Sequence, residues 1–107
     1  MERLRSNLEF QSVYQTGKSY ANRYYVIYMS KNDLGINRLG VSVSKKVGNS
    51  VVRHRTIRLL RESYLMVKEQ LVPGYHIVVI AKPEAKDRSL AEISGAFQQL
   101  LKKKKLV

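Results

Sequence analysis

The chain has 107 residues, enough for one small hydrophobic core, and we expect a single domain over residues 1–107. Its 20 Lys and Arg residues against 8 Asp and Glu residues give a formal charge of +12, which favours an anionic partner, and the absence of cysteine excludes disulfide bonds, thiolate zinc sites and cysteine nucleophiles. The longest apolar run, residues 77–81, is too short to cross a bilayer and the first residues do not resemble a signal peptide, so we expect a cytoplasmic protein without a membrane partner.

The first half of the chain is predicted to hold a helix followed by strands. Residues 6–9 have the S-x-x-E form of a capping box, and Gly17 can end the helix that the box begins. Tyrosines and β-branched residues alternate over residues 23–29 and predict a strand, which the turn residues at 31–35 end. Residues 39–44 alternate between apolar and small side chains, so we expect a further strand with one packed face.

The second half is predicted to hold two helices and one strand. Asn49 or Ser50 can cap a helix that we expect to run to about Leu71, before a Pro-Gly pair that ends it. Residues 76–81 predict a buried strand, and a second capping box at residues 89–92 begins the last helix.

These elements predict the fold class. We expect an α+β sandwich with three helices and a mixed sheet of about four strands, in the order helix-strand-strand-strand-helix-strand-helix. The basic residues at the end of the chain, 102–107, are expected to form a flexible tail.

A cationic stretch without acidic residues lies at the centre of the chain. Residues 35–61 contain seven basic residues, namely Arg38, Lys45, Lys46, Arg53, Arg55, Arg58 and Arg61. A helical wheel collects basic residues on one side, His54, Arg58, Arg61 and Lys68, with Arg53 and Arg55 at its margins. The opposite side is mostly apolar and comprises Val52, Thr56, Leu59, Leu60, Ser63, Met66 and Val67.

The start of this helix adds to its cationic character. Free backbone N–H groups and the positive end of the helix dipole are expected near Lys45, Lys46 and Asn49, and Gly48 permits a tight turn. Arginine can donate two parallel hydrogen bonds to phosphate oxygens and keeps its charge. Nucleic acid is therefore our first hypothesis for the partner, and a solvated basic face with a few ion pairs is the purely structural alternative.

Two further groups of residues have both a functional and a structural interpretation. Phe10 and Tyr14 are one helical turn apart, and Tyr24 and Tyr28 share a strand face, so an aromatic wall could stack unpaired bases, although the same spacing suits core packing. His54 and His76 could act as the acid-base pair of a protein nuclease, but the sequence supplies no third member for such a site.

The central motif and its flanks resemble a known family. Residues 43–55, Val-Ser-Lys-Lys-Val-Gly-Asn-Ser-Val-Val-Arg-His-Arg, closely resemble the signature of the protein subunit of bacterial ribonuclease P. The patterns at residues 10–14, 21–23 and 80–83 are similar to that family as well. The likeness covers nearly the whole chain, and a motif of this length is highly specific.

The resemblance implies a ribonucleoprotein enzyme whose chemistry lies in its RNA. The catalytic RNA is expected to use Mg²⁺ ions, held by the RNA and the substrate, to remove the 5′ leader from precursor tRNA. The small basic protein is expected to bind the catalytic RNA and the leader, to hold no catalytic residue and no metal, and to have no DNA partner. The implied fold has a left-handed crossover around the basic helix.

The resemblance also assigns residues to the two RNA contacts. The residues expected to contact the catalytic RNA are Lys45, Lys46, Gly48, Asn49, Arg53, His54, Arg55, Arg58 and Arg61. Those expected to contact the precursor-tRNA leader are Phe10, Tyr14 and Tyr28. The chain departs from the family pattern at His54, where Asn is usual, and at Ile57, where Lys is usual. A free-standing RNA-binding protein of ribosomal type is the main alternative.

Overall fold

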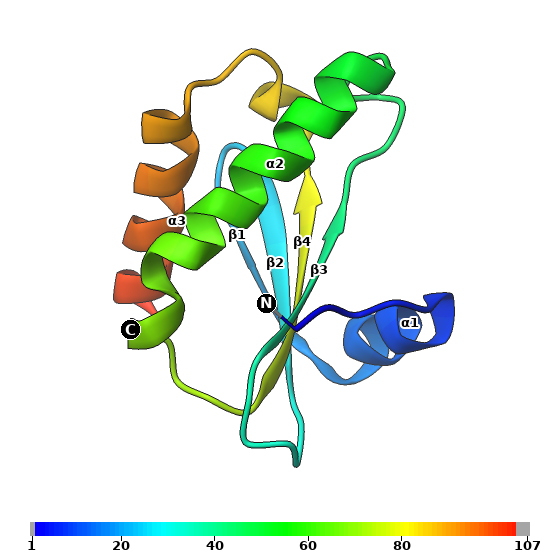
Figure 1. Ribbon diagram of the computed structural model, residues 1–107, viewed down its shortest axis with the longest axis vertical. Helices are drawn as coiled ribbons and strands as arrows, with labels where there is room; N and C mark the ends of the chain where they lie inside the picture. The colour runs from blue at the N-terminus through cyan, green and yellow to red at the C-terminus, as the bar shows by residue number, and fades with distance from the viewer. Residues whose placement is uncertain (1, 105–107) are drawn as a thin grey trace.

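The computed structural model describes residues 2–104, which contain three α-helices and four β-strands (Figure 1). In chain order they are α1 (Asn7–Thr16), β1 (Lys18–Ala21), β2 (Tyr25–Lys31), β3 (Arg38–Ser42), α2 (Ser50–Val67), β4 (Tyr75–Ala81) and α3 (Leu90–Lys103). Two short 3-10 helices, η1 (Lys68–Gln70) and η2 (Pro83–Ala85), follow α2 and β4. The predicted α+β class and the order of the elements are confirmed.

Side-chain caps begin all three α-helices. The capping boxes predicted at residues 6–9 and 89–92 are both formed, at the starts of α1 and α3. Asn49, rather than Ser50, caps α2, because its side-chain Oδ1 accepts a hydrogen bond from the backbone N–H of Val52 at 3.0 Å. The starts of the helices are therefore determined by local side chains.

The four strands form one mixed sheet in the order β1-β2-β4-β3. β2 is antiparallel to β1 and β4, whereas β3 is parallel to β4, with Leu39 opposite Ile77. The parallel strands β3 and β4 are connected through α2. In Figure 1, α2 lies in front of the sheet, both strands point upward and β4 lies to the left of β3, so the connection is left-handed. The resemblance implied this unusual hand, since nearly all such connections are right-handed.

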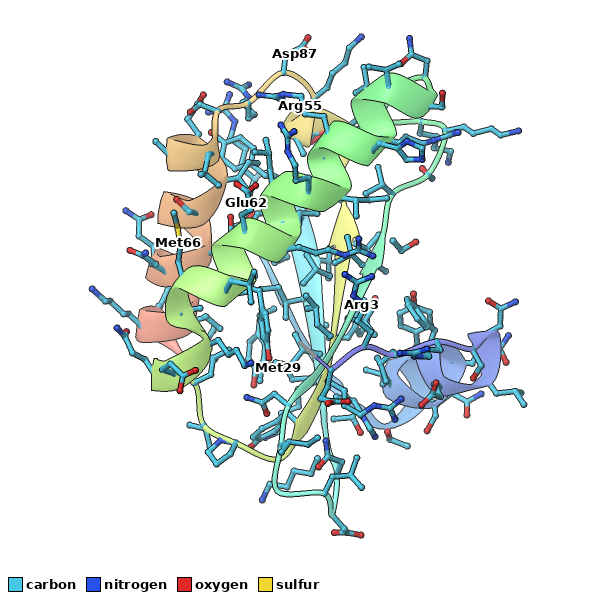
Figure 2. The ribbon with its side chains drawn as sticks, in the orientation of Figure 1. Arg3, Met29, Arg55, Glu62, Met66 and Asp87 are labelled. Carbon is cyan, nitrogen blue, oxygen red and sulfur yellow. The ribbon has the colours of Figure 1, made fainter. Side chains whose placement is uncertain are left out.

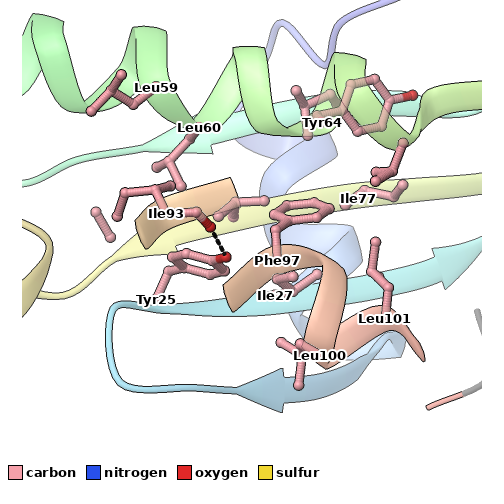
Figure 3. Packing of buried hydrophobic residues seen from close by; sticks show 14 of the residues in the cluster. Tyr25, Ile27, Leu59, Leu60, Tyr64, Ile77, Ile93, Phe97, Leu100 and Leu101 are labelled. Atoms are coloured by element: carbon pink, nitrogen blue, oxygen red, sulfur yellow. Dashed lines mark hydrogen bonds between the residues drawn. The ribbon is translucent and has the colours of Figure 1, made fainter. Parts of the chain in front are cut away.

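Helices cover both faces of the sheet. α2 and α3 pack on the face that carries Tyr25, Ile27 and Met29 of β2 (Figure 3). The Tyr25 hydroxyl donates a hydrogen bond to the backbone oxygen of Ile93 in α3 at 2.8 Å. α1 lies on the other face, above a smaller buried cluster of Leu4, Val13 and Val78. The two faces therefore present different surfaces to solvent, one formed by α2 and α3 and one by α1.

The amino-terminal segment extends the sheet beyond β3. The N–H of Leu4 donates to the oxygen of Leu39, and the N–H of Leu39 donates to the oxygen of Glu2, both at 3.0 Å. Arg3 and Leu39 form the corresponding parallel bridge. At this point β3 has a hydrogen-bonded neighbour on each side.

The first two strands differ from the sequence prediction. β1 was not predicted at its own residues, because this four-residue edge strand has only one half-buried side chain, Tyr20, and hence no periodic signal. β2 covers residues 25–31 instead of 23–29, so Tyr24 precedes the strand and packs against the core under α2 and α3, not on the face of Tyr28 as predicted. The later start of β2 is explained by a turn at Asn22. Its Oδ1 accepts hydrogen bonds from the backbone N–H groups of Tyr24 and Tyr25.

The basic helix α2 also differs in detail from the prediction. It ends at Val67, and η1 follows before Leu71 is reached. Met66, which we placed on the apolar side, is 52% exposed, whereas Tyr64 is 1% exposed. The buried side of α2 is therefore rotated toward Tyr64, and Met66 lies at its margin.

β3 and α3 also end at other residues than the sequence predicted. β3 covers residues 38–42, so the predicted strand ends earlier than residue 44. α3 includes Lys102 and Lys103, so the basic residues expected in a tail begin inside the helix. Residues 105–107 of that tail lie outside the described residues.

Candidate nucleic-acid interface

The outer side of α2 carries the cations that the wheel predicted. His54 and Arg58 are exposed and Arg61 is half-buried, and we call these three residues the basic side of α2. Within residues 2–104, its single ion pair joins Arg58 Nε to a Glu62 carboxylate oxygen at 3.9 Å. Both side chains of this pair are exposed, so it contributes little. The basic side is therefore rigidly held by the helix and largely unneutralised.

Arg61 has the most confined position on the basic side. Burial lowers the pKa of its guanidinium, and the charge of Arg3 lowers it further. An arginine stays protonated despite such a shift, so Arg61 keeps its positive charge. Arg3 was not predicted from the sequence as part of this surface.

The loop before α2 presents Lys45 and Lys46 from a fixed turn. Both lysines are exposed, while the neighbouring Val47 is 2% exposed and anchors the turn in the core. A Cβ atom on Gly48 would lie 2.7 Å from Cγ1 of Val52, so only glycine permits this close approach of loop and helix. The predicted role of Gly48 in a tight turn agrees with this packing.

The margins of α2 have different environments. Arg55 Nη2 donates a hydrogen bond to the backbone oxygen of Arg88 at 2.9 Å, on the side of α2 that faces α3 (Figure 2). Arg53 and Ile57 are half-buried, and Ile57 lies next to the basic side in a shallow depression. Arg55 thus helps to hold the loop before α3. A helical wheel of α2 could not predict this contact, because Arg88 lies outside the helix.

Phe10, Tyr14 and Tyr28 gather on the opposite face of the sheet, and we call them the aromatic cluster. The rings of Tyr14 and Tyr28 meet edge to face, with 5.1 Å between their centroids. The ring of Phe10 packs on β3, where a Cβ atom on Gly40 would lie 2.5 Å from its Cζ atom. Tyr14 is 37% exposed, and Phe10 and Tyr28 are half-buried. All three predicted residues therefore lie together, and each keeps some exposed surface.

The two histidines lie on opposite faces of the sheet. His54 is on the outer side of α2, whereas His76 pairs with Ser30 and lies near α1, beside the ion pair of Arg38 and Glu9 at 2.6 Å. Burial, followed by the charge of Arg38, lowers the pKa of His76, and its buried Nδ1 atom has no hydrogen-bond partner within the described residues. The two imidazoles do not meet, which excludes them as an acid-base pair.

Comparison with known proteins identifies the family. A family model described as Ribonuclease P matches residues 1–105. The chain belongs to the ribonuclease P protein family. The ribonuclease P protein component of Lachnoclostridium phytofermentans is 50% identical over 106 residues, covering 99% of this chain and 91% of that protein. That of Clostridium botulinum (strain Langeland) is 52% identical over 102 residues, covering 94% of this chain and 92% of that protein.

A solved structure supports the same conclusion. The Staphylococcus aureus RNase P protein has a TM-score of 0.90 with this chain at 37% sequence identity, covering 99% of this chain and 97% of that one. The chain is thus a component of a tRNA-processing endoribonuclease and has the ribonuclease P RNA as its partner.

The described residues contain neither a metal-binding cluster nor a membrane-spanning helix. Among residues 2–104, no three His, Cys, Asp or Glu side chains gather as a metal site. In the same part of the chain, none of the helices has the length and hydropathy needed to span a membrane.

Proposed function

We propose that this chain binds the catalytic RNA of ribonuclease P through α2 and the 5′ leader of precursor tRNA through the aromatic cluster, and so promotes removal of the leader. The observation that carries the proposal is the separation of two surfaces by one sheet. Within residues 2–104, the cations on one face have a single long ion pair, and partly exposed rings lie on the other face.

The contact with the catalytic RNA is supported by the arrangement of positive charge. Lys45 and Lys46 are exposed in the turn that leads into α2, where backbone N–H groups and the helix dipole favour phosphate. Contacts to phosphates supply most of the affinity of such interfaces and make it depend on salt. The rigid backbone of α2 keeps these contacts in register along the RNA.

The contact with the leader is supported by the chemistry of the aromatic cluster. Unpaired bases stack on exposed aromatic rings, and each stacked base contributes about 1 to 3 kcal/mol of binding free energy. The Tyr14 and Tyr28 rings hold each other edge to face, which fixes their orientation before any ligand binds. A single-stranded leader is a suitable ligand for this surface.

The Mg²⁺ ions of the reaction are proposed to be held by the RNA and the substrate. Among residues 2–104, no three His, Cys, Asp or Glu side chains gather that could hold such an ion, so we assign none of these residues to it. The contribution of the chain is affinity and orientation, and we place this activity in the cytoplasm.

The proposal is tested by cleavage of a precursor tRNA at low magnesium concentration. A bacterial ribonuclease P RNA is assayed with and without the full chain, beside a lane that contains the protein alone. We expect stimulation only when the RNA is present. Binding of the RNA without stimulation would support the alternative, a free-standing RNA-binding protein of ribosomal type. Cleavage by the protein alone would contradict our assignment of the chemistry to the RNA.

A further inference from the structure

β2 extends past β1 at one edge of the sheet, and a groove lies there. β1 begins at Lys18, opposite Met29. The next residues of β2, Ser30 and Lys31, therefore pair with β4 and have no partner in β1. The groove is lined by residues of α1, β1, β2 and β4, and its volume of about 750 Å³ is in the range of small-molecule sites.

α1 separates this groove from the aromatic cluster. Val13 is buried against the sheet, and successive residues of a helix are about 100° apart around its axis. Phe10 and Tyr14 therefore lie on one side of Val13, whereas Ser12 and Thr16, which line the groove, lie on the other. The groove is at the end of the sheet where β4 begins, the lower end in Figure 1, whereas α2 begins at the upper end. It is thus distinct from both surfaces of the proposed function.

The formal charges of the groove are positive. Lys18 of β1 and Lys31 of β2 both line it and are both exposed. Within residues 2–104, no acidic side chain lines the groove, and neither lysine forms an ion pair. Lys104 adds a further cation nearby, since its Nζ is 5.8 Å from the centroid of the Tyr20 ring, which also lines the groove. Cations from different elements without an acid favour an anionic ligand such as a phosphate.

Two tyrosine rings offer a surface for a flat group. Tyr20 and Tyr75 line the groove, are half-buried and pack against the core under α2 and α3. This packing fixes the position of the rings, and the part that remains exposed can stack on a nucleobase.

The hydroxyl groups of the groove can accept hydrogen bonds. Thr16 Oγ1 donates to the backbone oxygen of Ser12 at 2.8 Å. Because a hydroxyl has one proton, the hydrogen bond of 2.8 Å between Thr16 Oγ1 and Ser30 Oγ is donated by Ser30. Both oxygens then keep lone pairs for a donor of the ligand, such as a ribose hydroxyl.

We propose that this groove binds a nucleoside phosphate. The lysines would neutralise the phosphate, a tyrosine ring would stack on the base, and the Thr16 and Ser30 oxygens would accept hydrogen bonds from the sugar. This site goes beyond the proposed function and does not rest on it, because the groove shares no residue with α2 or the aromatic cluster. Its ligand is either a free nucleotide or one nucleotide of an RNA strand, and the test separates these sources.

The test is an NMR titration of the isotopically labelled full chain. AMP and inorganic phosphate are the two probes. The backbone amide signals of Lys18, Ser30 and His76 report on the groove, and those of Lys46 and Asn49 report on the start of α2.

Three variants separate the parts of the site. Lys18→Ala/Lys31→Ala removes the lysine charges of the groove. The matched control, Arg5→Ala/Lys86→Ala, removes the same charge from exposed positions outside the groove. Tyr20→Leu removes the ring and keeps an apolar side chain against the core. Circular dichroism and urea unfolding check that each variant is folded.

AMP should shift the groove signals in a saturable way. Lys18→Ala/Lys31→Ala should weaken AMP binding by about tenfold or more, and the control variant by less than about twofold. Tyr20→Leu should weaken AMP binding by about tenfold, through loss of one stacked base, and leave the affinity for phosphate unchanged.

A leader oligonucleotide then distinguishes the sources of the ligand. If the oligonucleotide shifts the groove signals and AMP displaces it, the groove binds a nucleotide of an RNA strand. If it leaves these signals unchanged while AMP shifts them, the ligand is a free nucleotide.

Two outcomes would overturn the assignment of this site. If AMP shifts only the signals of α2, or if the control variant loses as much affinity as Lys18→Ala/Lys31→Ala, the groove is not a binding site. The proposed function is then unaffected, because it is tested with ribonuclease P RNA. If phosphate binds as tightly as AMP and Tyr20→Leu changes nothing, the groove holds a simple anion and not a nucleoside phosphate.

Discussion

The start of α3 and the outer side of α2 are both rich in basic residues, but they use these residues differently. At the start of α3, Arg88 Nε donates to the backbone oxygen of Glu84 at 3.1 Å, and Arg88 Nη1 lies 3.4 Å from a Glu92 carboxylate oxygen. The same guanidinium lies 5.3 Å from the centroid of the Tyr24 ring. Arg88 is therefore engaged by the fold from three directions.

The basic side of α2 has almost none of these internal contacts. Arg58 has one long ion pair with Glu62, and the positive neighbour of Arg61 is another arginine. The number of basic residues therefore does not distinguish a structural surface from a binding surface. The better criterion is whether the fold neutralises the cations that it positions.

The largest effect should come from removing two arginines of α2. We expect Arg53→Ala/Arg58→Ala to lower affinity for ribonuclease P RNA by about 100-fold and to reduce the log–log salt slope by about 1.4 to 1.8, because two phosphate contacts are lost. The matched control, Lys86→Ala/Arg88→Ala, removes the same charge near α3 and should change both quantities much less. Equal losses in a binding titration would show that net charge alone sets the affinity.

Gly48, in the loop before α2, and Gly95, in α3, should respond differently to replacement by alanine. Gly48→Ala should lower the free energy of unfolding by about 1 to 3 kcal/mol, because the new Cβ atom would overlap the side chain of Val52. Gly95→Ala in α3 meets no atom within 4 Å and should stabilise the chain by about 0.5 to 1 kcal/mol. Urea unfolding measures both. Destabilisation of similar size at the two positions would mean that the packing at Gly48 is not the cause.

Variants at the N-caps of α2 and α3 distinguish an effect on stability from an effect on RNA binding. Asn49→Ala and Ser89→Ala should each lower the free energy of unfolding by about 1 kcal/mol, because each removes an N-cap. Asn49→Ser keeps the cap but removes the side-chain amide. If this amide contacts RNA, Asn49→Ser should lower RNA affinity with stability retained, as measured by titration and urea unfolding. An unchanged affinity would restrict Asn49 to its role as a cap.

The smallest effect concerns pH and the start of α3. Hydrogen bonding by the backbone N–H of Ser89 holds the pKa of Glu92 below its ordinary value. The folded state therefore favours the carboxylate, and this stabilisation, present above the ordinary glutamate pKa, is lost as the pH falls through the lowered value. Unfolding in urea between about pH 6 and about pH 3 should show a smaller loss of stability for Glu92→Gln than for wild type. Identical pH profiles would contradict a stabilising role of the Glu92 charge.

Features that depend on neighbouring residues could be predicted from the sequence. The two capping boxes and Asn49 determine where the helices begin, and the alternation over residues 23–29 predicts the strand observed as β2. The wheel of α2 places Arg58 on the exposed side because the helical period alone decides it. The exposed positive charge of α2 could therefore be predicted from the sequence without knowledge of the fold.

Features that depend on distant pairing could not be predicted in this way. The bridge between Arg3 and Leu39 joins residues that are far apart in the sequence, and no local pattern indicates it. The hydrogen bond from Arg55 to the backbone of Arg88 requires the packing of α2 against the loop before α3. The left hand of the crossover followed from the family resemblance, because general rules favour the opposite hand.

The two proposed RNA-binding surfaces, α2 and the aromatic cluster, can be separated by comparing Tyr28→Ala with Arg58→Ala. The affinities of the reconstituted holoenzyme for precursor tRNA with its leader and for mature tRNA are measured, together with the affinity of each variant for ribonuclease P RNA. We predict that Tyr28→Ala weakens binding of the precursor by about tenfold and leaves mature tRNA unchanged, through loss of stacking. Arg58→Ala should weaken binding of the RNA subunit itself. Equal losses for precursor and mature tRNA in both variants would contradict the division into two surfaces.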